Sequence, residues 1–484
     1  MDPILYWNDV ALEANRRDFT DGPPEQGGPT LSSRALAIVH LAMYDAYAGA
    51  RGNPTGAGTA TGGGQLALPA YLAGLPTPTT GASAAAAVAE AAHVVLSVLY
   101  PRQQPQFDAK LTTAPLGTGN IADGLAWGRT VADHLLALRK SDPGAGSGGY
   151  VPSSARGHHR VDPANPTQGF HAPYFGAVAK CFAVTTRHSL SAPPKPGDAR
   201  YLKELREVRA KGIATELSAT VKRSDRRTPD QTLSGIYWAY DGAKNLGTPP
   251  RLYNQIVRKV AEKQLATLTD QERTDRNARL FALVNVSMGD AGILAWQQKY
   301  VHDLWRPVVG IREHDVSMGP AAGGGVSHID DDCDTQWLPL GAPKSNEKLD
   351  PFTPPFPAYP SGHATFGAAA LHITRRFFGV AAGNVANDHL ADGLTFVSDE
   401  CNGTTTDGKG VVRPRHSRQF AGGLWDMILE NSASRVYLGV HWRFDGYLAK
   451  ADGSPDIPSN IGGVPLGLKI ANDVFDTHLH QSTV

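Results

Sequence analysis

Hydrophobic and polar positions along the chain follow a mainly helical pattern. Apolar residues recur every three or four positions over residues 122–138, which places them on one broad face of a helix. Similar patterns predict helices over residues 34–47, 82–99, 253–268, 270–300, 365–378 and 420–437, the first of them capped by Ser32 and Ser33. Alternation with a period of two is scarce. We therefore predict an all-α fold made of packed helical bundles.

Four stretches rich in glycine and proline interrupt this pattern, at residues 51–64, 141–175, 315–360 and 399–417. Connections of this length are usually functional or disordered. The stretch 315–360 leads directly into the sequence PSGH at 360–363, so we expect it to be ordered and to form part of a pocket wall. The chain shows no internal repeat of 20–50 residues.

Charge excludes some classes of partner. The chain has 46 Lys and Arg against 46 Asp and Glu, for a formal net charge of zero. We therefore predict neither a nucleic-acid surface nor insertion into a membrane, and any cationic site must be local. The apolar stretch 82–100 contains Glu90 and His93, which favours a buried helix over a membrane span.

The N-terminal sequence and the cysteines give information about the cellular compartment of the protein. No basic segment followed by an apolar one begins the chain, so no conventional signal peptide is predicted. A cytoplasmic location is then the default, with unconventional secretion as the alternative. Cys181, Cys333 and Cys401 form no CxxC pair and are odd in number, which favours free thiols over a single disulfide.

The first motif with candidate chemistry is KYVHDLWRP at residues 299–307. Lys299 and Arg306 are seven residues apart, about two turns of a helix, so both cations could lie near one face. Pro307 disfavours a helical conformation at Arg306, and we expect the helix to end there. In isolation, such cations near a helix end are usually solvated.

The second motif is PSGH at residues 360–363, followed at once by a helical pattern. Ser361 falls at the predicted N-cap of that helix. The backbone N–H groups of Gly362 and His363 would then point out of the helix N-terminus, where free donors and the helix dipole favour an anion. Alone, such a tetrapeptide is more often the ordinary capped start of a helix.

The third motif is SRVYLGVHWRFD at residues 434–445. Arg435 and His441 are six residues apart, about 120° around an ideal helix. They converge only if the helix ends near Gly439, where glycine makes a turn plausible. Asp445 could orient His441 through its second ring nitrogen. Alone, a histidine near a helix end is more often structural.

Taken together, the three motifs supply three cations, a hydroxyl, a helix N-terminus and two histidines. Burying such a cluster is costly unless it meets an anion. Arginine suits bidentate contacts with oxyanions, and lysine acts as a point charge. The combination predicts a site for a tetrahedral, multiply charged oxyanion.

The order K-x6-RP, PSGH and SR-x5-H-x3-D resembles the signature of the type 2 phosphatidic acid phosphatase and vanadium haloperoxidase superfamily. Flanking residues resemble vanadium chloroperoxidases in particular, and the likeness covers most of the chain. The resembling stretches are residues 5–16, 31–47, 237–258, 295–312, 354–367 and 434–446. The resemblance implies two four-helix bundles with long loops, at residues 1–250 and 251–484, with the site in the second.

The resemblance also implies roles for single residues. Its cofactor is vanadate, with His441 as the axial ligand to vanadium. The residues that would hold the vanadate oxygens are Lys299, Arg306, Ser361, Gly362 and Arg435. His363 would also lie at the cofactor as the acid–base residue, and His363, Lys299 and His441 would be the catalytic residues. Asp241 would pair with Arg435.

Trp296 and Phe356 match residues that line the halide side of chloroperoxidases. In bromoperoxidases of this family the position of Phe356 tends to be His, so Phe favours chloride. The implied activity is oxidation of chloride and bromide by hydrogen peroxide to hypohalous acid, which halogenates a small organic acceptor. Without the resemblance, core packing is the ordinary account of both aromatic residues.

Three alternatives remain open. The first is an acid phosphatase on the same site, with His441 as nucleophile, Asp445 as its orienting partner and His363 as the acid. The second is a peroxidase selective for bromide or iodide. The third is an oxyanion-binding or storage protein, against which both histidines and Asp445 argue. A separate acidic loop, with Asp330, Asp331, Asp332 and Asp334, is either solvated or a divalent cation site.

Overall fold

The structure is a computed structural model that describes residues 1–51 and 69–484. The predicted loop at 51–64 falls outside these residues except for Arg51. Within the described ranges the regular structure is helical, and β-pairing is limited to isolated bridges. This confirms the predicted all-α fold.

The longer helices are α1 (Pro3–Asp18), α2 (Gly28–Ala50), α3 (Ala84–Leu99), α4 (Gln104–Thr112), α5 (Ile121–Arg139), α7 (Ala199–Lys211), α8 (Pro229–Tyr237), α9 (Pro249–Gln264), α10 (Asp270–His302), α12 (Gly362–Phe377), α13 (Gly423–Tyr437) and α15 (Gly463–Asp476). The short ones are α6 (Phe175–Val178), α11 (Pro307–Arg312) and α14 (Arg443–Gly446).

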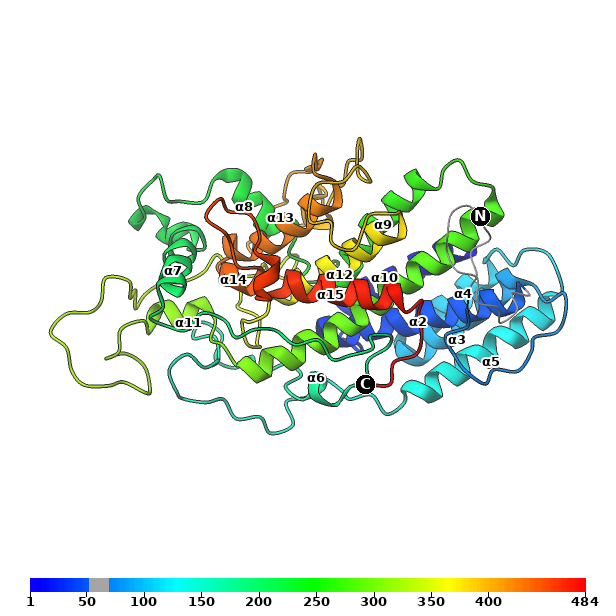
Figure 1. Cartoon of the computed structure of the whole chain (residues 1–484), viewed down its shortest axis with the longest axis horizontal. Coiled ribbons are helices and arrows are strands. Elements are labelled where there is room, and N and C mark those ends of the chain that lie inside the picture. Colours follow the sequence, from blue (N-terminus) through cyan, green and yellow to red (C-terminus); the bar gives the residue numbers. More distant parts are fainter. Residues whose placement is uncertain (52–68) are drawn as a thin grey trace.

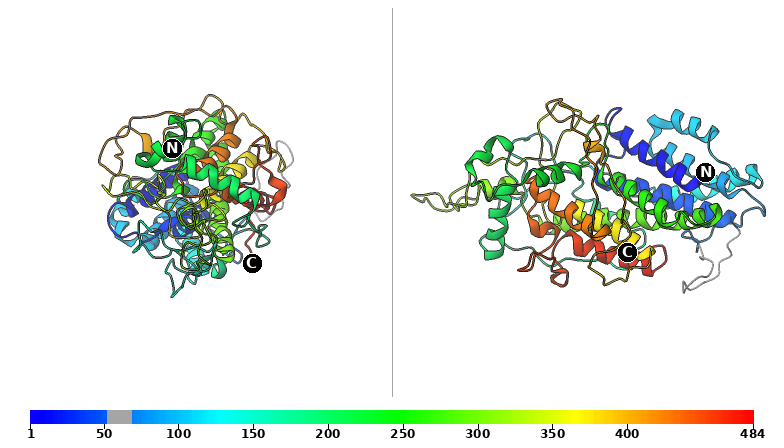
Figure 2. Two further views of the ribbon diagram at one scale, coloured as in Figure 1. Left: turned by 90° about the vertical axis from the view of Figure 1, so that its left-hand side faces the viewer. Right: turned by 90° about the horizontal axis from the view of Figure 1, so that it is seen from above.

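The molecule is elongated, and α10 runs through its middle (Figure 1). At one end α10 packs against α2, which in turn packs against α3 and α5. Further along, α10 packs against α12 and α15, and α12 also contacts α9 and α13. Figure 2 shows the same two groups of helices on either side of the centre. The expected division of the chain at residue 250 stays a prediction, because α10 belongs to both groups by contact.

Helix α10 is the central core element. Its residues 277–296 are buried around the whole circumference, as expected of a helix that neighbours cover on every side. Among the described residues it is the one helix long and apolar enough to cross a membrane, and its most apolar window is entirely buried in the fold. Its apolar composition is therefore that of a core helix.

Several predicted helix boundaries were wrong. Helix α2 begins at Gly28, not at residue 34, because Pro29 occupies its first turn. The expected cap does not form: Ser32 and Ser33 donate their hydroxyls to the carbonyls of Gln26 and Thr30.

Helix α9 begins at Pro249, four residues earlier than predicted, and again proline lies in the first turn. Five of the longer helices have no counterpart among the predicted helices: α1, α4, α7, α8 and α15. In α1 the apolar pattern is broken by Asn8 and Asn15, both of which are buried and hydrogen-bonded inside the fold.

The break after α10 also differs from the prediction. The helix ends at His302, and Asp303 adopts a left-handed conformation with φ +46°. Arg306 is therefore the N-cap residue of α11 and shares no helix face with Lys299. The prolyl ring of Pro307 starts a new helix and does not merely end the old one.

All three cysteines are free: Cys181 and Cys401 are buried and Cys333 is partly so. The prediction of free thiols is confirmed for the described residues.

Candidate functional site

The N-terminus of α12 forms the floor of the candidate site. Ser361 is the N-cap residue and accepts a hydrogen bond from the amide of Ala364 at 3.4 Å, as predicted. Its own amide donates to the carbonyl of Asp445 at 2.8 Å, which ties the helix start to the third motif. The amides of Gly362 and His363 belong to the first turn, where no intrahelical acceptor exists.

Lys299 is fully buried behind this helix start. Its ammonium donates to the carbonyls of Pro357, Ala358 and Pro360, at 2.8, 3.2 and 2.6 Å. The loop before PSGH therefore fixes the charge in place. Burial, with Arg306 nearby, lowers the pKa of Lys299 well below its usual value.

Arg306 lies beside Lys299 and bridges two motifs. Its Nε donates to the carbonyl of Phe356 at 2.8 Å, and its Nη1 donates to Val440 at 2.8 Å and to Nε2 of His441 at 2.9 Å. Its Nη2 is buried and has no partner among the described residues. Burial lowers the pKa of Arg306 to about 9. A free buried guanidinium donor is costly unless a ligand accepts from it.

Arg435 pairs with a carboxylate, whereas Arg306 contacts backbone carbonyls and a neutral histidine. Both of its terminal nitrogens donate to Asp241, at 2.8 and 2.9 Å, in a bidentate pair that is almost completely buried. Its Nε has no partner among the described residues. The pair fixes the orientation of the guanidinium and leaves one donor available.

His441 has a defined tautomer. Its Nδ1 lies 2.8 Å from Asp445, and its Nε2 faces a guanidinium N–H of Arg306. An arginine can only donate, so Nε2 must be the acceptor and Nδ1 carries the proton. Burial and the nearby Arg306 and Lys299 lower the pKa of His441 well below its usual value. His441 is thus a neutral imidazole with an Nε2 lone pair, the form that binds metals.

His363 has the opposite tautomer to His441. Its Nε2 lies 2.6 Å from the carbonyl of Ala239, which can only accept, so Nε2 carries the proton and Nδ1 is unprotonated. Burial lowers the pKa of His363 to about 4, and the charge of Arg435 adds to this. In this form His363 can accept a proton at Nδ1.

The turn after α13 brings the third motif into the site. The helix ends at Tyr437, and Gly439 has φ +73°, as the convergence of Arg435 and His441 requires. A Cβ at Gly439 would come within 2.4 Å of the carbonyl oxygen of Gly212, so only glycine fits.

These side chains meet at a cavity of about 210 Å³. Of the residues predicted for the site, those on its wall are Asp241, Trp296, Phe356, Gly362, His363, Arg435 and His441. Lys299, Arg306, Ser361 and Asp445 lie behind the wall, in contact with residues that form it. The predicted wall function of residues 315–360 is confirmed, because five of the cavity residues lie in this stretch, from Lys344 to Phe356.

An aromatic pair on the cavity wall lies beside the buried ammonium of Lys299. The rings of Trp296 and Phe356 are 4.7 Å apart. The ammonium of Lys299 lies 5.0 Å from the Phe356 ring and 5.6 Å from the Trp296 ring. Ring faces stabilise cations, and apolar rings exclude water from them.

Some residues near the site were not predicted. His171 lines the cavity, with its ring 5.9 Å from Trp296 and 6.1 Å from Phe356, and burial lowers its pKa to about 4. Burial lowers the pKa of His159 well below its usual value, and the charges of Arg306 and Lys299 add to this. Lys344 lies on the cavity wall. All three come from loops without regular periodicity, so spacing carried no signal for them.

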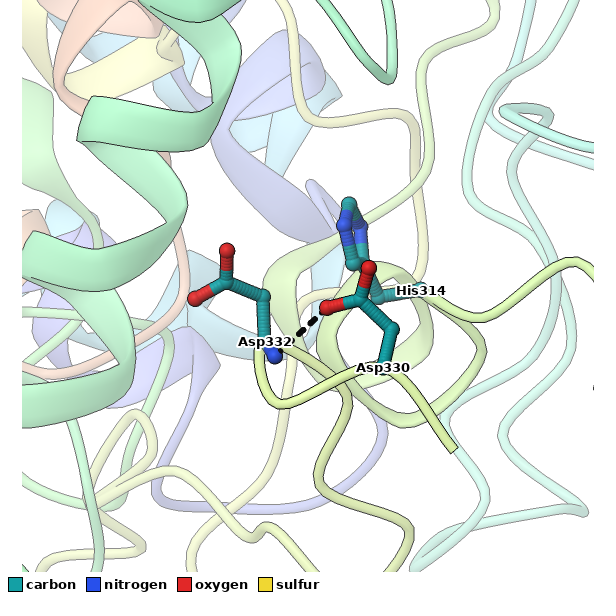
Figure 3. A group of neighbouring side chains, drawn as sticks. All are labelled: His314, Asp330 and Asp332. Carbon is teal, nitrogen blue, oxygen red and sulfur yellow. Dashed lines mark hydrogen bonds between the residues drawn. The ribbon is translucent and has the colours of Figure 1, made fainter. Parts of the chain in front are cut away.

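The acidic loop lies away from this cavity. Asp330, Asp332 and His314 come together there (Figure 3), with potential ligand atoms within 4.8 Å of one another. Asp332, however, pairs with Arg206 through contacts of 2.8–3.1 Å. Because Arg206 neutralises this carboxylate, its burial is explained without a metal ion. A larger cavity of about 1260 Å³ adjoins this loop, and charged residues on its wall pair with each other, as Glu207 does with Arg443.

Comparison with known proteins agrees with the geometry. The family model for the vanadium chloroperoxidase N-terminal domain matches residues 1–171, and the model for the second helical-bundle domain of the same enzyme matches residues 279–455. Vanadium chloroperoxidase from Curvularia inaequalis is 35% identical over 98% of this chain and 90% of that protein.

Two solved structures share the fold. A bacterial vanadium-dependent iodoperoxidase has a TM-score of 0.63 at 19% identity and covers 98% of this chain and 96% of its own. A bacterial vanadium-dependent chloroperoxidase in its apo form has a TM-score of 0.60 at 18% identity, with 93% and 94% covered. Family models for both helical domains and a relative similar over nearly the whole chain lead to one conclusion: this chain belongs to the vanadium chloroperoxidase family of vanadium-dependent haloperoxidases.

Proposed function

We propose that this protein binds vanadate in the cavity at the start of α12 and oxidises chloride and bromide with hydrogen peroxide. The products are hypohalous acids, which halogenate a small organic acceptor. Oxidation of halide by peroxide is the activity of the family, and the choice of halide is the proposal. The observation that carries it is the convergence of unpartnered buried cationic donors and a neutral histidine beside an apolar aromatic pair.

The donor set fits vanadate. Two guanidinium N–H groups, Nη2 of Arg306 and Nε of Arg435, are buried without partners among the described residues, and an oxyanion would satisfy both. In the proposed assignment Arg306, Ser361, Gly362 and Arg435 would hold the oxygens, and Nε2 of His441 would be the ligand to vanadium. Lys299 would contribute its positive charge, because backbone carbonyls already accept from its three N–H groups. When bound, vanadate supplies a Lewis acid that activates hydrogen peroxide without changing oxidation state.

The other steps belong to the protein. His363 accepts a proton from hydrogen peroxide at Nδ1, while its Nε2–H stays on the carbonyl of Ala239. Lys299 and the two arginines stabilise negative charge throughout, from positions that the surrounding hydrogen bonds fix in advance. Overall, hydrogen peroxide, one halide ion and one proton give hypohalous acid and water.

Phe356 is the basis for including chloride. Its ring closes the cavity beside Lys299 and contacts Trp296, so a halide there would meet apolar ring edges and a buried ammonium. Chloride holds its hydration shell more tightly than bromide does. A site that replaces water with a fixed cation and rings therefore matters most for chloride.

A phosphatase reading of the same site is the strongest alternative. A neutral His441 oriented by Asp445 would also suit a nucleophile on phosphorus. Against this, the relative that is similar over most of the chain is a chloroperoxidase, and the apolar pair has no role in hydrolysis of a phosphate ester.

A single substitution tests the proposed halide range. We expect the vanadate-loaded enzyme to chlorinate and brominate a diketone dye. Phe356→His should lower kcat/KM for chloride at least tenfold, about 1.4 kcal/mol, and leave that for bromide within a factor of about three. The measurement is steady-state dye halogenation with each halide. Phe352→His is the control, because Phe352 lines the same cavity but, unlike Phe356, has no ring contact with Trp296 or Lys299 among the described residues. Equal losses for both halides, or no chlorination by the unmodified enzyme, would remove chloride from the proposal.

A further inference from the structure

The cavity at the start of α12 has two chemically distinct parts. The inner part is polar, with His363, Arg435 and His441. The outer part is apolar, lined by aromatic and proline side chains: Phe19, Pro29, Pro249, Phe352, Pro354 and Pro355. Small anions and peroxide need no such apolar approach. A wall of rings and prolines is typical of sites for aromatic ligands.

One charged side chain on this outer wall has an ionic partner but no hydrogen bond among the described residues. Of the charged residues that line the cavity, Asp241 and Arg435 neutralise each other through the bidentate pair. Lys344 is the remaining one. Its ammonium lies 4.8 Å from the ring of Phe352 and 3.7 Å from the carboxylate of Glu347. The carboxylate of Glu347 thus forms an ion pair with Lys344, but the distance is too long for a hydrogen bond, so the ammonium has donors left for a ligand.

The position of Lys344 suits this purpose. It follows a buried stretch of the loop, and its side chain is 29% exposed, so a ligand in the cavity and solvent can both reach it. The next lysine along, Lys348, is exposed and does not line the cavity. The charge at residue 344 is therefore placed by the fold, at the rim of an apolar cavity whose inner end holds the candidate catalytic groups.

We propose that the outer part of the cavity binds the organic acceptor, and that this acceptor is a small electron-rich aromatic carboxylate whose anionic group pairs with Lys344. This inference rests on the proposed function and adds to it the class of acceptor. The ring lies among the phenylalanine and proline side chains. At about 210 Å³ the cavity is smaller than the roughly 300–1,000 Å³ of sites for drug-sized ligands, which limits the acceptor to a single ring.

The bound ring intercepts hypohalous acid before it leaves the cavity. The electron-rich carbon attacks the halogen, a carbon–halogen bond forms, and the oxygen–halogen bond breaks. The proton lost from the same carbon joins the departing hydroxide to give water. One hypohalous acid and one aromatic C–H thus give one aryl halide and one water.

The first test measures binding without any turnover. 4-Hydroxybenzoate is titrated into the full-length protein by calorimetry, and 4-hydroxybenzamide serves as the uncharged ligand of matched shape. We expect the carboxylate to bind about tenfold more tightly than the amide, as for a charge-assisted contact at a partly exposed site. Lys344→Met should remove this preference, and the matched variant Lys348→Met should keep it.

The second test is competition during bromination. The vanadate-loaded enzyme receives both ligands together, and the ratio of brominated products is compared with the ratio that reagent hypobromite gives. We expect the enzyme to favour the carboxylate about tenfold over the reagent, and Lys344→Met to return the ratio to that of the reagent. A ratio equal to the reagent's in the unmodified enzyme, or equal binding of carboxylate and amide, would overturn the inference.

The two levels of the proposal fail in different ways. Formation of hypobromite without any organic acceptor, followed as tribromide, measures halide oxidation separately from acceptor binding, and Lys348→Met should leave it unchanged. If the unmodified enzyme halogenates no dye, the proposed function itself is wrong. If it halogenates the dye and shows no preference for the carboxylate, only the acceptor site is wrong.

Discussion

His441→Ala is expected to weaken vanadate binding by more than about 100-fold and to remove peroxidase activity with it. Loss of a side chain that merely orients a metal ligand typically costs 10–100-fold in affinity, and loss of the ligand itself costs more. The structure gives His441 an unprotonated Nε2 and fixes it through Nδ1 to Asp445. Alanine removes the neutral nitrogen lone pair that faces Arg306 in the site.

Vanadate titration of the apo-protein, followed by calorimetry and by bromination rate, measures both effects. His302→Ala is a suitable control, because His302 lies at the end of α10 and does not line the cavity. Circular dichroism checks that each variant is folded. If His441→Ala bound vanadate within about threefold of the unmodified protein, His441 would not be the ligand to vanadium.

His363→Ala should have a different signature. We expect kcat for bromide oxidation to fall about 100- to 10,000-fold, the usual contribution of a positioned acid–base residue. Vanadate affinity should change by less than about tenfold, because the backbone N–H at residue 363 and the start of α12 remain. The loss of kcat is expected from the tautomer, because Nδ1 of His363 is unprotonated and can accept a proton while its Nε2–H donates to the carbonyl of Ala239.

Rate and affinity measured on the same preparation separate the two roles of His363. A parallel loss of vanadate affinity, with kcat kept when vanadate saturates the variant, would contradict proton transfer by His363. It would assign the side chain to cofactor binding alone.

The sequence predicted the parts of the site that depend on local backbone chemistry. Serine before a helical pattern gave the N-cap at Ser361, and glycine between Arg435 and His441 gave the turn that brings them together. Both features follow from rules about three to six neighbouring residues, which sequence spacing contains.

Features that depend on contacts between residues far apart in the sequence could not be predicted from local spacing. Lys299 and Arg306 were placed on one helix face, yet the left-handed Asp303 separates them and tertiary contacts to Phe356 and His441 bring them together. Only the family resemblance suggested Asp241 as the partner of Arg435, since the two are 194 positions apart. Lys344 and His171 lie in loops whose course depends on packing.

Reconstitution with vanadate tests the central claim most directly. The protein is stripped of oxyanions, and orthovanadate is added back in steps. Each sample is assayed for dye halogenation with hydrogen peroxide and halide, and for hydrolysis of an aryl phosphate. We predict that halogenation is absent without vanadate and rises to saturation near one vanadate per chain. Phosphate-ester hydrolysis that vanadate inhibits, with no halide oxidation at any vanadate concentration, would contradict the account and make His441 a nucleophile.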